Sequence, residues 1–173
     1  MRQITFVFAT GESWMDSMVT RVTKSRWSHV AIKFDTDDIL VEALAGKGLI
    51  LQSGQKYDEW IPSLFVTKQV SEAAYDKMLS LSRQWAALNI PYGYRTCAAI
   101  GVQELFGRYA GQLALDGFVQ NRMETLVCSE VLVTLWRIAD PSFLPGREAR
   151  LVSPNEFLQA LKAECPICEI DKQ

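Results

Sequence analysis

The chain has 173 residues, of which 49% are hydrophobic and 22% charged, as in an ordinary globular protein that buries its own core. Its 18 basic and 20 acidic residues give a net charge of −2, which argues against nucleic acid as a partner because phosphate binding requires a basic face. No apolar run is long enough for a membrane span. We therefore expect a single domain over residues 1–173.

The first half of the chain is rich in strand-forming residues. Segments of β-branched, aromatic or alternating residues predict strands over residues 4–9, 27–34, 39–44, 49–51 and 64–67. Between the first two, Trp14, Met15, Met18 and Val22 recur at helical spacing and predict a short helix over residues 14–24. The polar cluster at residues 35–38 is a turn signal, so the second and third strands should form a β-hairpin.

The second half favours helices. Apolar periodicity and capping residues predict helices over residues 71–88, 96–109, 128–138 and 154–163. Ser71 is the expected cap of the first, and Ser153 with Glu156 forms a capping box before the last. Residues 110–124 are polar and irregular, so we expect an inserted loop there. Strands grouped before helices indicate an α+β fold.

Two residues together fit nucleophilic catalysis. His29 is the only histidine, so any imidazole chemistry must use it. Cys128 lies at the expected start of a helix, after Thr125 as a candidate cap, where unpaired N–H groups and the helix dipole lower the pKa of a thiol. Each has an ordinary structural alternative. His29 could be a strand histidine without a catalytic task, and Cys128 could be a small buried residue on a core helix. As a pair they match what a cysteine hydrolase requires.

Glu42 is the candidate for the group that orients the imidazole. If the hairpin turns about residues 36–37, paired residue numbers sum to 73, so His29 faces Leu44 and Ala31 faces Glu42. Glu42 then projects on the same face as His29, as its diagonal neighbour, within reach of the ring. A slip of one residue would turn it to the opposite face. The structural alternative is an outward, solvated glutamate.

Four segments carry a further signal, TKSRWSHVAI at residues 23–32, VEA at 41–43, PYGY at 91–94 and VCSEV at 127–131. In this order they resemble the circularly permuted branch of the NlpC-type papain-like superfamily, over roughly residues 5–140. The resemblance implies a papain-like α+β fold in which an antiparallel sheet packs against helices. It also implies that Cys128 is the nucleophile, His29 the general base and Glu42 the orienting residue.

The same resemblance suggests where substrate binds. Tyr92 matches a tyrosine of the family near the cleft, with a role in binding substrate or stabilising an oxyanion. Trp27 and Ser28, next to His29, complete the expected substrate-binding set, and Trp60 is expected with Trp27 in the cleft wall. The family often has an acidic residue after the tyrosine, whereas this chain has Gly93.

The implied activity is cleavage of amide bonds through an acyl-enzyme, without a cofactor, and the family suggests peptidoglycan stem peptides as substrate. Two alternatives stay open. The same Cys–His pair could hydrolyse or transfer acyl groups of lipids or thioesters, which an apolar wall at Trp27 and Trp60 would favour. The chain could also be a non-catalytic binding module of this fold. None of these patterns indicates an oligomeric state.

Cysteine usage and the N-terminal residues bear on metal binding and compartment. Cys165 and Cys168 form a C-x-x-C pair near the end of the chain, but a structural zinc site needs four ligands and no other residue shows ligand spacing. We therefore expect neither a metal nor a redox site. The first residues do not resemble an export signal, so a cytoplasmic location is expected, with export by another route left open.

Overall fold

The structure, a computed structural model, describes residues 1–11, 14–57, 63–118, 125–164 and 169–172. Within this part of the chain the strands are β1 (Arg2–Ala9), β2 (His29–Phe34), β3 (Ile39–Leu44), β4 (Gly48–Ser53), β5 (Ser63–Val70) and β6 (Glu169–Lys172). The α-helices are α1 (Trp14–Thr23), α2 (Glu72–Ala87), α3 (Tyr94–Phe106), α4 (Arg108–Phe118), α5 (Cys128–Ala139) and α6 (Pro154–Glu164). Two short 3-10 helices are η1 (Gly54–Tyr57) and η2 (Ala149–Leu151). The fold class is α+β, as expected.

The strands form one antiparallel sheet with the order β4-β3-β2-β1-β5-β6. The first four strands form a meander, because each pairs with the next along the chain. β5 then returns to the free side of β1, and β6 from the chain end pairs with β5. β6 was not expected from the sequence. The composition of this segment does not indicate a strand. It forms one because it pairs with β5, which is distant in the chain.

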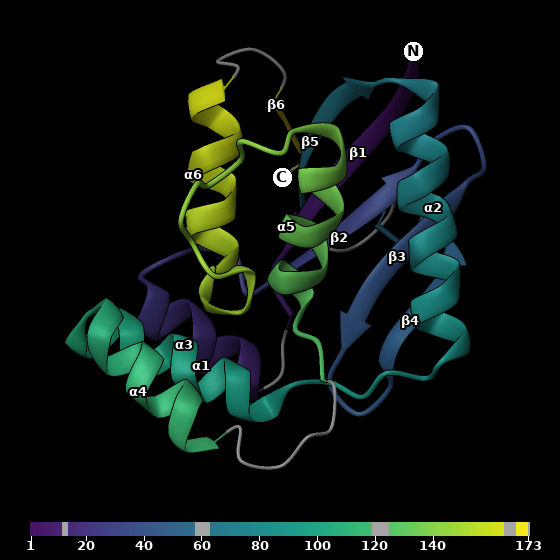
Figure 1. Cartoon of the computed structure of the whole chain (residues 1–173). Helices are drawn as coiled ribbons and strands as arrows, with labels where there is room; N and C mark the ends of the chain where they lie inside the picture. The colour runs from purple at the N-terminus through teal and green to yellow at the C-terminus, as the bar shows by residue number, and fades with distance from the viewer. Residues whose placement is uncertain (12–13, 58–62, 119–124, 165–168, 173) are drawn as a thin grey trace.

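Helices α2, α5 and α6 cover one face of the sheet (Figure 1). Alternation along β1 directs Ile4, Phe6 and Phe8 to this face, and all three are fully buried. The Phe6 ring contacts Trp136 of α5 and Phe157 of α6 edge to face, with centroids 5.4 and 5.2 Å apart. This packing fixes α5 across the middle of the sheet, with its first turn near the start of β2.

The expected inserted loop at residues 110–124 is wrong over residues 110–118, which belong to α4; residues 119–124 lie outside the described residues. Gly107, with φ of 92°, ends α3 and begins the turn into α4, so the predicted helix over residues 96–109 stops at Phe106. α4 folds back onto α3, and a Cβ at Gly111 would lie 2.4 Å from the Cβ of Gln103. Tertiary packing therefore makes a helix of a segment whose local sequence favours a loop.

Helices α1, α3 and α4 gather at one end of the sheet, below α5 in Figure 1. α1 lies beside α3, where Val22 approaches Gly101. The side chains of Trp14, Met15 and Met18, on which the helical prediction rested, lie outside the described part of the chain. In that part of the chain, no helix has the length and apolar character needed to cross a bilayer.

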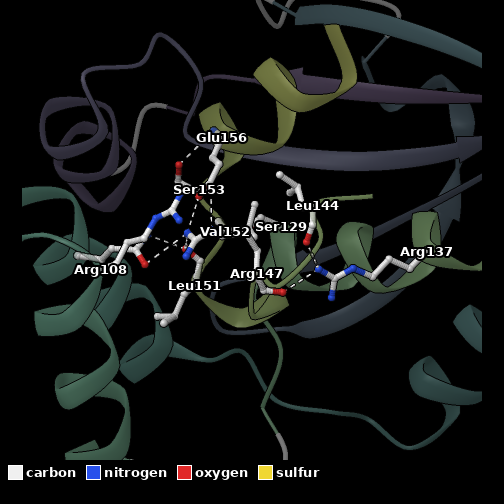
Figure 2. Close-up of polar contacts among 10 residues, drawn as sticks. Arg108, Ser129, Arg137, Leu144, Arg147, Leu151, Val152, Ser153 and Glu156 are labelled. Atoms are coloured by element: carbon white, nitrogen blue, oxygen red, sulfur yellow. Dashed lines mark hydrogen bonds and ion pairs between the residues drawn. The ribbon is translucent and has the colours of Figure 1, made fainter. Parts of the chain in front are cut away.

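The segment between α5 and α6 is held by two half-buried arginines (Figure 2). The Arg137 guanidinium donates to the carbonyl oxygens of Leu144 at 2.9 Å and Arg147 at 2.7 Å. Arg147 in turn makes a two-point contact with Glu156 of α6, with both N–O distances 2.7 Å. Because bidentate arginine–carboxylate contacts are directional, they set the position of α6 relative to α5.

Candidate active site

Cys128 is the first residue of α5. Val127 precedes it as the N-cap in extended conformation, and the Val127 N–H donates to Oε2 of Glu130 at 3.4 Å. The expected cap, Thr125, lies two residues further back and is not the cap. Ser129, the second residue of the helix, donates its hydroxyl proton to the carbonyl of Val152 at 2.5 Å (Figure 2). These contacts hold the first turn of α5, where the helix dipole favours a negative charge.

His29 is the first residue of β2 and lies opposite Ala9 of β1. Trp27 and Ser28, expected in the same strand, precede it. The pairing of β2 with β3 extends only as far as Ile32 and Val41. At His29 the two strands have therefore diverged, and α5 packs against β2. His29 and the backbone N–H of Val30 both lower the pKa of the Cys128 thiol.

The β2–β3 register has the expected sum of 73, with Ile32 opposite Val41 and Lys33 opposite Leu40. Glu42 consequently lies diagonal to His29, and its Oε2 is 2.9 Å from the His29 Nε2. Because Nε2 bonds to Glu42, Nδ1 is the ring nitrogen left for the sulfur of Cys128. The structure thus brings together the three residues expected to form the catalytic set.

Glu42 is fully buried and has further partners that the sequence did not indicate. The Tyr57 hydroxyl donates to its Oε2 at 2.7 Å, while Gln52 Nε2 and Lys56 Nζ donate to its Oε1. Both carboxylate oxygens are therefore satisfied, which a buried anion requires. Gln52 of β4 lies opposite Leu40 of β3. Strand alternation could therefore have predicted that Gln52 is a diagonal neighbour of Glu42. Lys56 and Tyr57 lie in η1 and carried no such signal.

These contacts set the charges of the site. Burial lowers the pKa of His29, but the hydrogen bonds to Cys128 and Glu42 outweigh it and raise this pKa to about 9. Burial raises the pKa of Glu42, yet His29, Lys56 and Tyr57 bring it down to about 2. Burial also raises the pKa of the Cys128 thiol. The effect of His29 is larger and opposite, so the pKa of this thiol lies below its ordinary value. These shifts all favour the charged forms of the three groups, a thiolate, an imidazolium and a carboxylate.

The position of Tyr92 is fixed by backbone hydrogen bonds of the residues before and after it. Leu126, just before α5, donates its N–H to Pro91 and accepts from Gly93, at 3.1 and 3.0 Å. The Tyr92 ring is half-buried and its hydroxyl lies 3.2 Å from Sγ of Cys97. Burial and the negative charge of Cys128 raise the pKa of Tyr92, so its hydroxyl keeps its proton.

The glycine after Tyr92, where the resembled family often has an acidic residue, has a steric reason. A Cβ at Gly93 would lie 3.1 Å from Oγ1 of Thr125 and 3.2 Å from both Oγ1 of Thr96 and Cγ1 of Val127. A side chain at this position would therefore require its neighbours before α5 and at the start of α3 to shift by a few tenths of an ångström. This crowding keeps Tyr92 close to the first turn of α5.

Trp27 and Ser28 are both buried, at 6% and 7% exposure, so neither presents a wide surface to a ligand. Trp27 packs in the main core. The Ser28 hydroxyl donates to Asp16 of α1 at 2.7 Å and accepts from the N–H of Gly11 at 3.2 Å. The charge of Asp16 also raises the pKa of Tyr92, which places this carboxylate near the site although the sequence did not single it out.

Three residues weighed in the sequence, Trp60, Cys165 and Cys168, lie outside the described residues. Among the residues that are described, no group of three or more His, Cys, Asp and Glu side chains is arranged to hold a metal ion. Comparison of the chain with models of known protein families, with curated proteins and with solved structures gives no match.

Proposed function

We propose that the chain is a cysteine-dependent hydrolase of the circularly permuted NlpC-type papain-like fold, and that it cleaves amide bonds. The observation that carries the proposal is the 2.9 Å contact between His29 and the buried Glu42, together with the effects of His29 and Cys128 on each other's pKa, which is raised for the imidazole and lowered for the thiol. The three residues come from β3, β2 and α5, and a nucleophile, a base and an orienting group in contact are what a catalytic triad requires.

The reaction begins with attack of the Cys128 thiolate on the carbonyl carbon of the substrate. The C–N bond then breaks, the carbonyl carbon stays on sulfur as a thioester, and His29 gives its proton to the departing amine. A water molecule next attacks the thioester, while His29 accepts its proton and Cys128 leaves as thiolate. Glu42 remains ionised throughout, because its low pKa keeps the proton on the ring.

The start of α5 also offers a place for the oxyanion that forms during attack. The first N–H groups of a helix have no acceptor within the helix, and Cys128 occupies the first position of α5. Its own N–H is therefore the donor that we assign to the oxyanion. The neutral hydroxyl of Tyr92 is a second candidate donor, since the raised pKa keeps its proton in place.

The substrate class that the resemblance suggests is a peptide, with peptidoglycan stem peptides as the first to test. The full chain is incubated with stem peptides, unrelated peptide amides and fatty-acyl thioesters, then quenched in acid and digested for mass spectrometry. We expect an acyl adduct on the Cys128 peptide and release of amine from a peptide substrate. Cys128→Ala should abolish both, whereas the matched control Cys97→Ala should retain them.

The remaining outcomes separate this proposal from its alternatives. An adduct and product from thioesters alone would replace the amidase by an acyl hydrolase or transferase with the same Cys–His pair. Absence of adduct and product from every substrate, with Cys128 inert to alkylation at neutral pH, would leave a binding module of this fold.

A further inference from the structure

The buried carboxylate of Glu42 lies between two cationic groups of the described part of the chain. The His29 ring binds its Oε2, and the Lys56 ammonium binds its Oε1. Glu42 is fully buried, whereas the lysine side chain keeps 30% exposure. Because a buried anion is unfavourable unless it is compensated, the negative charge of this carboxylate is shared between the ring on one oxygen and the lysine on the other.

η1 brings Lys56 to the carboxylate, and the turn of the β2–β3 hairpin anchors η1. The N–H of Gly54, the first residue of η1, donates to the carbonyl oxygen of Asp38 at 2.9 Å. A Cβ at Gly54 would lie 2.5 Å from Oδ1 of Asp38, so this approach favours glycine. At the other end of η1, the Tyr57 hydroxyl donates to Oε2 of Glu42, and its ring centre lies 4.9 Å from the Lys56 ammonium.

The charge of Glu42 has two opposite effects on the proposed reaction. Burial lowers the pKa of the His29 ring, and contacts with Cys128 and then Glu42 raise it. A ring that keeps its proton stabilises the thiolate before attack, but it is a weaker acid when the amine must leave. At that stage the sulfur is bonded to carbon and carries no charge. Glu42 is then the anion in contact with the ring that still retains the proton.

We infer that Lys56 is a positioning residue for this reaction. Its ammonium holds the Glu42 carboxylate against the ring and takes up part of its negative charge, which lets His29 release its proton to the leaving amine. Lys56 keeps its own protons and acts through Glu42. The inference rests on the proposed hydrolase function, but its central measurement needs no substrate.

Four other titratable groups surround the ring and the carboxylate. Cys128 belongs to α5, Tyr57 to η1 and Asp16 to α1, and Tyr92 lies just before α3. Burial is the main reason that the pKa of each tyrosine is raised, and the charges of Cys128 and Asp16 add to it, so both hydroxyls stay neutral. The ring is therefore best measured in Cys128→Ala, where the thiolate is absent as it is after attack and the lysine is the group that is varied.

His29 is the only histidine, so the full chain made with isotope-labelled histidine gives a single imidazole signal in NMR. Its chemical shift against pH reports the pKa of the ring. In the Cys128→Ala background, we expect Lys56→Met to raise the pKa of His29 by roughly half a pH unit or more, because a like charge has left its surroundings. Lys56→Arg should restore the original value. The matched control Lys47→Met neutralises an exposed lysine of the β3–β4 turn and should leave the value unchanged.

The direction of the change separates charge sharing from a merely structural role. If Lys56 only kept η1 in place, its loss would loosen Glu42 and lower the pKa of His29. A lowered or unchanged pKa in Lys56→Met would therefore overturn the inference, and so would an equal rise in Lys47→Met. Lys56→Gln is a second neutral replacement that can still donate to the carboxylate, and it should give the same rise.

A second measurement uses the proposed reaction, with Cys128 in place. An amine needs a proton from His29 in order to leave, whereas p-nitrophenolate leaves without one. We expect Lys56→Met to lower turnover of a peptide amide by a factor of about two or more, with little change in acylation by p-nitrophenyl acetate. Equal losses with both substrates would overturn the inference. A chain that reacts with neither would overturn the hydrolase proposal, whereas the pKa of His29 in Lys56→Met tests the charge sharing by itself.

Discussion

The Nε2 atom of His29 lies 2.9 Å from Oε2 of Glu42, and the two side chains differ in exposure, at 13% and 0%. The ring therefore stands between the surface and a fully buried anion. Its positive charge compensates that anion, and the anion in turn raises the pKa of the ring. The protonation of His29 and the ionisation of Glu42 are thus coupled, and each affects the Cys128 sulfur on the other side of the ring.

In the proposed mechanism, replacement of His29 by alanine removes both the group that stabilises the thiolate and the acid that protonates the leaving group. We expect His29→Ala to lower turnover by a factor on the order of 10²–10⁴. The melting temperature should fall only modestly, because Glu42 keeps Tyr57, Gln52 and Lys56 as partners. Turnover and melting temperature are measured on the same preparation. A folded variant with the original rate would end the Cys–His proposal, and an unfolded one would indicate a structural histidine.

Glu42→Gln keeps the side-chain volume but removes the charge that orients and stabilises the imidazolium. We expect turnover to fall by about 10²-fold or more, as in triads that lose their carboxylate. The matched control is Asp38→Asn, which neutralises an exposed carboxylate at the turn of the same hairpin and should have little effect. Activity assays of both variants decide the matter: equal rates for the two would remove Glu42 from the mechanism.

The pH dependence of activity follows from the same groups. His29 has its pKa raised to about 9 and Cys128 has its pKa lowered, so the thiolate–imidazolium pair exists between the two values. We expect activity to fall above about pH 9 as the ring loses its proton, and to fall in acid as the sulfur gains one. In Glu42→Gln the upper limb should move to lower pH, because the ring loses an anionic partner. Upper limbs at the same pH in both proteins would contradict this coupling.

The two described cysteines should differ in reactivity. Burial raises the pKa of Cys97 to about 12, whereas His29 holds that of Cys128 below its ordinary value. Limited alkylation with iodoacetamide at pH 7, followed by peptide mapping, should therefore modify Cys128 first. The same experiment on His29→Ala should slow modification of Cys128 and leave Cys97 unchanged. Preferential modification of Cys97 in the unaltered chain would refute the activated thiol.

Glu130, two residues after Cys128, should make stability depend on pH. Burial raises its pKa from 4.5 to about 7. The resulting stabilisation is fully present below pH 4.5 and is lost as the pH rises through 7, by up to about 3 kcal/mol. Glu130→Gln should therefore raise the melting temperature more at pH 8 than at pH 5. Glu148→Gln, which removes a half-exposed carboxylate also beside Arg150, is the control and should show a smaller difference, because the charge of Glu148 only adds to the effect of burial on the pKa of Glu130.

Residues close to one another in the chain determined much of the geometry of the site. The turn at residues 35–38 and the alternation on both sides of it predicted the register that makes His29 and Glu42 diagonal neighbours, and the paired residues confirm it. A hairpin register depends on contacts between residues close in the chain, so its pattern is visible in the sequence. The helical periodicity after Cys128 likewise predicted where α5 begins, although the cap proved to be Val127 and not Thr125.

The tertiary structure alone decided which distant elements meet. Packing of Phe6 against Trp136 and Phe157 positions α5 so that Cys128 reaches His29, and η1 brings Lys56 and Tyr57 to the carboxylate of Glu42. α4 is a helix only because it folds against α3, where its local sequence indicated a loop. Sequence patterns report the conformations that a segment prefers by itself, whereas these contacts depend on side-chain packing between segments far apart in the chain.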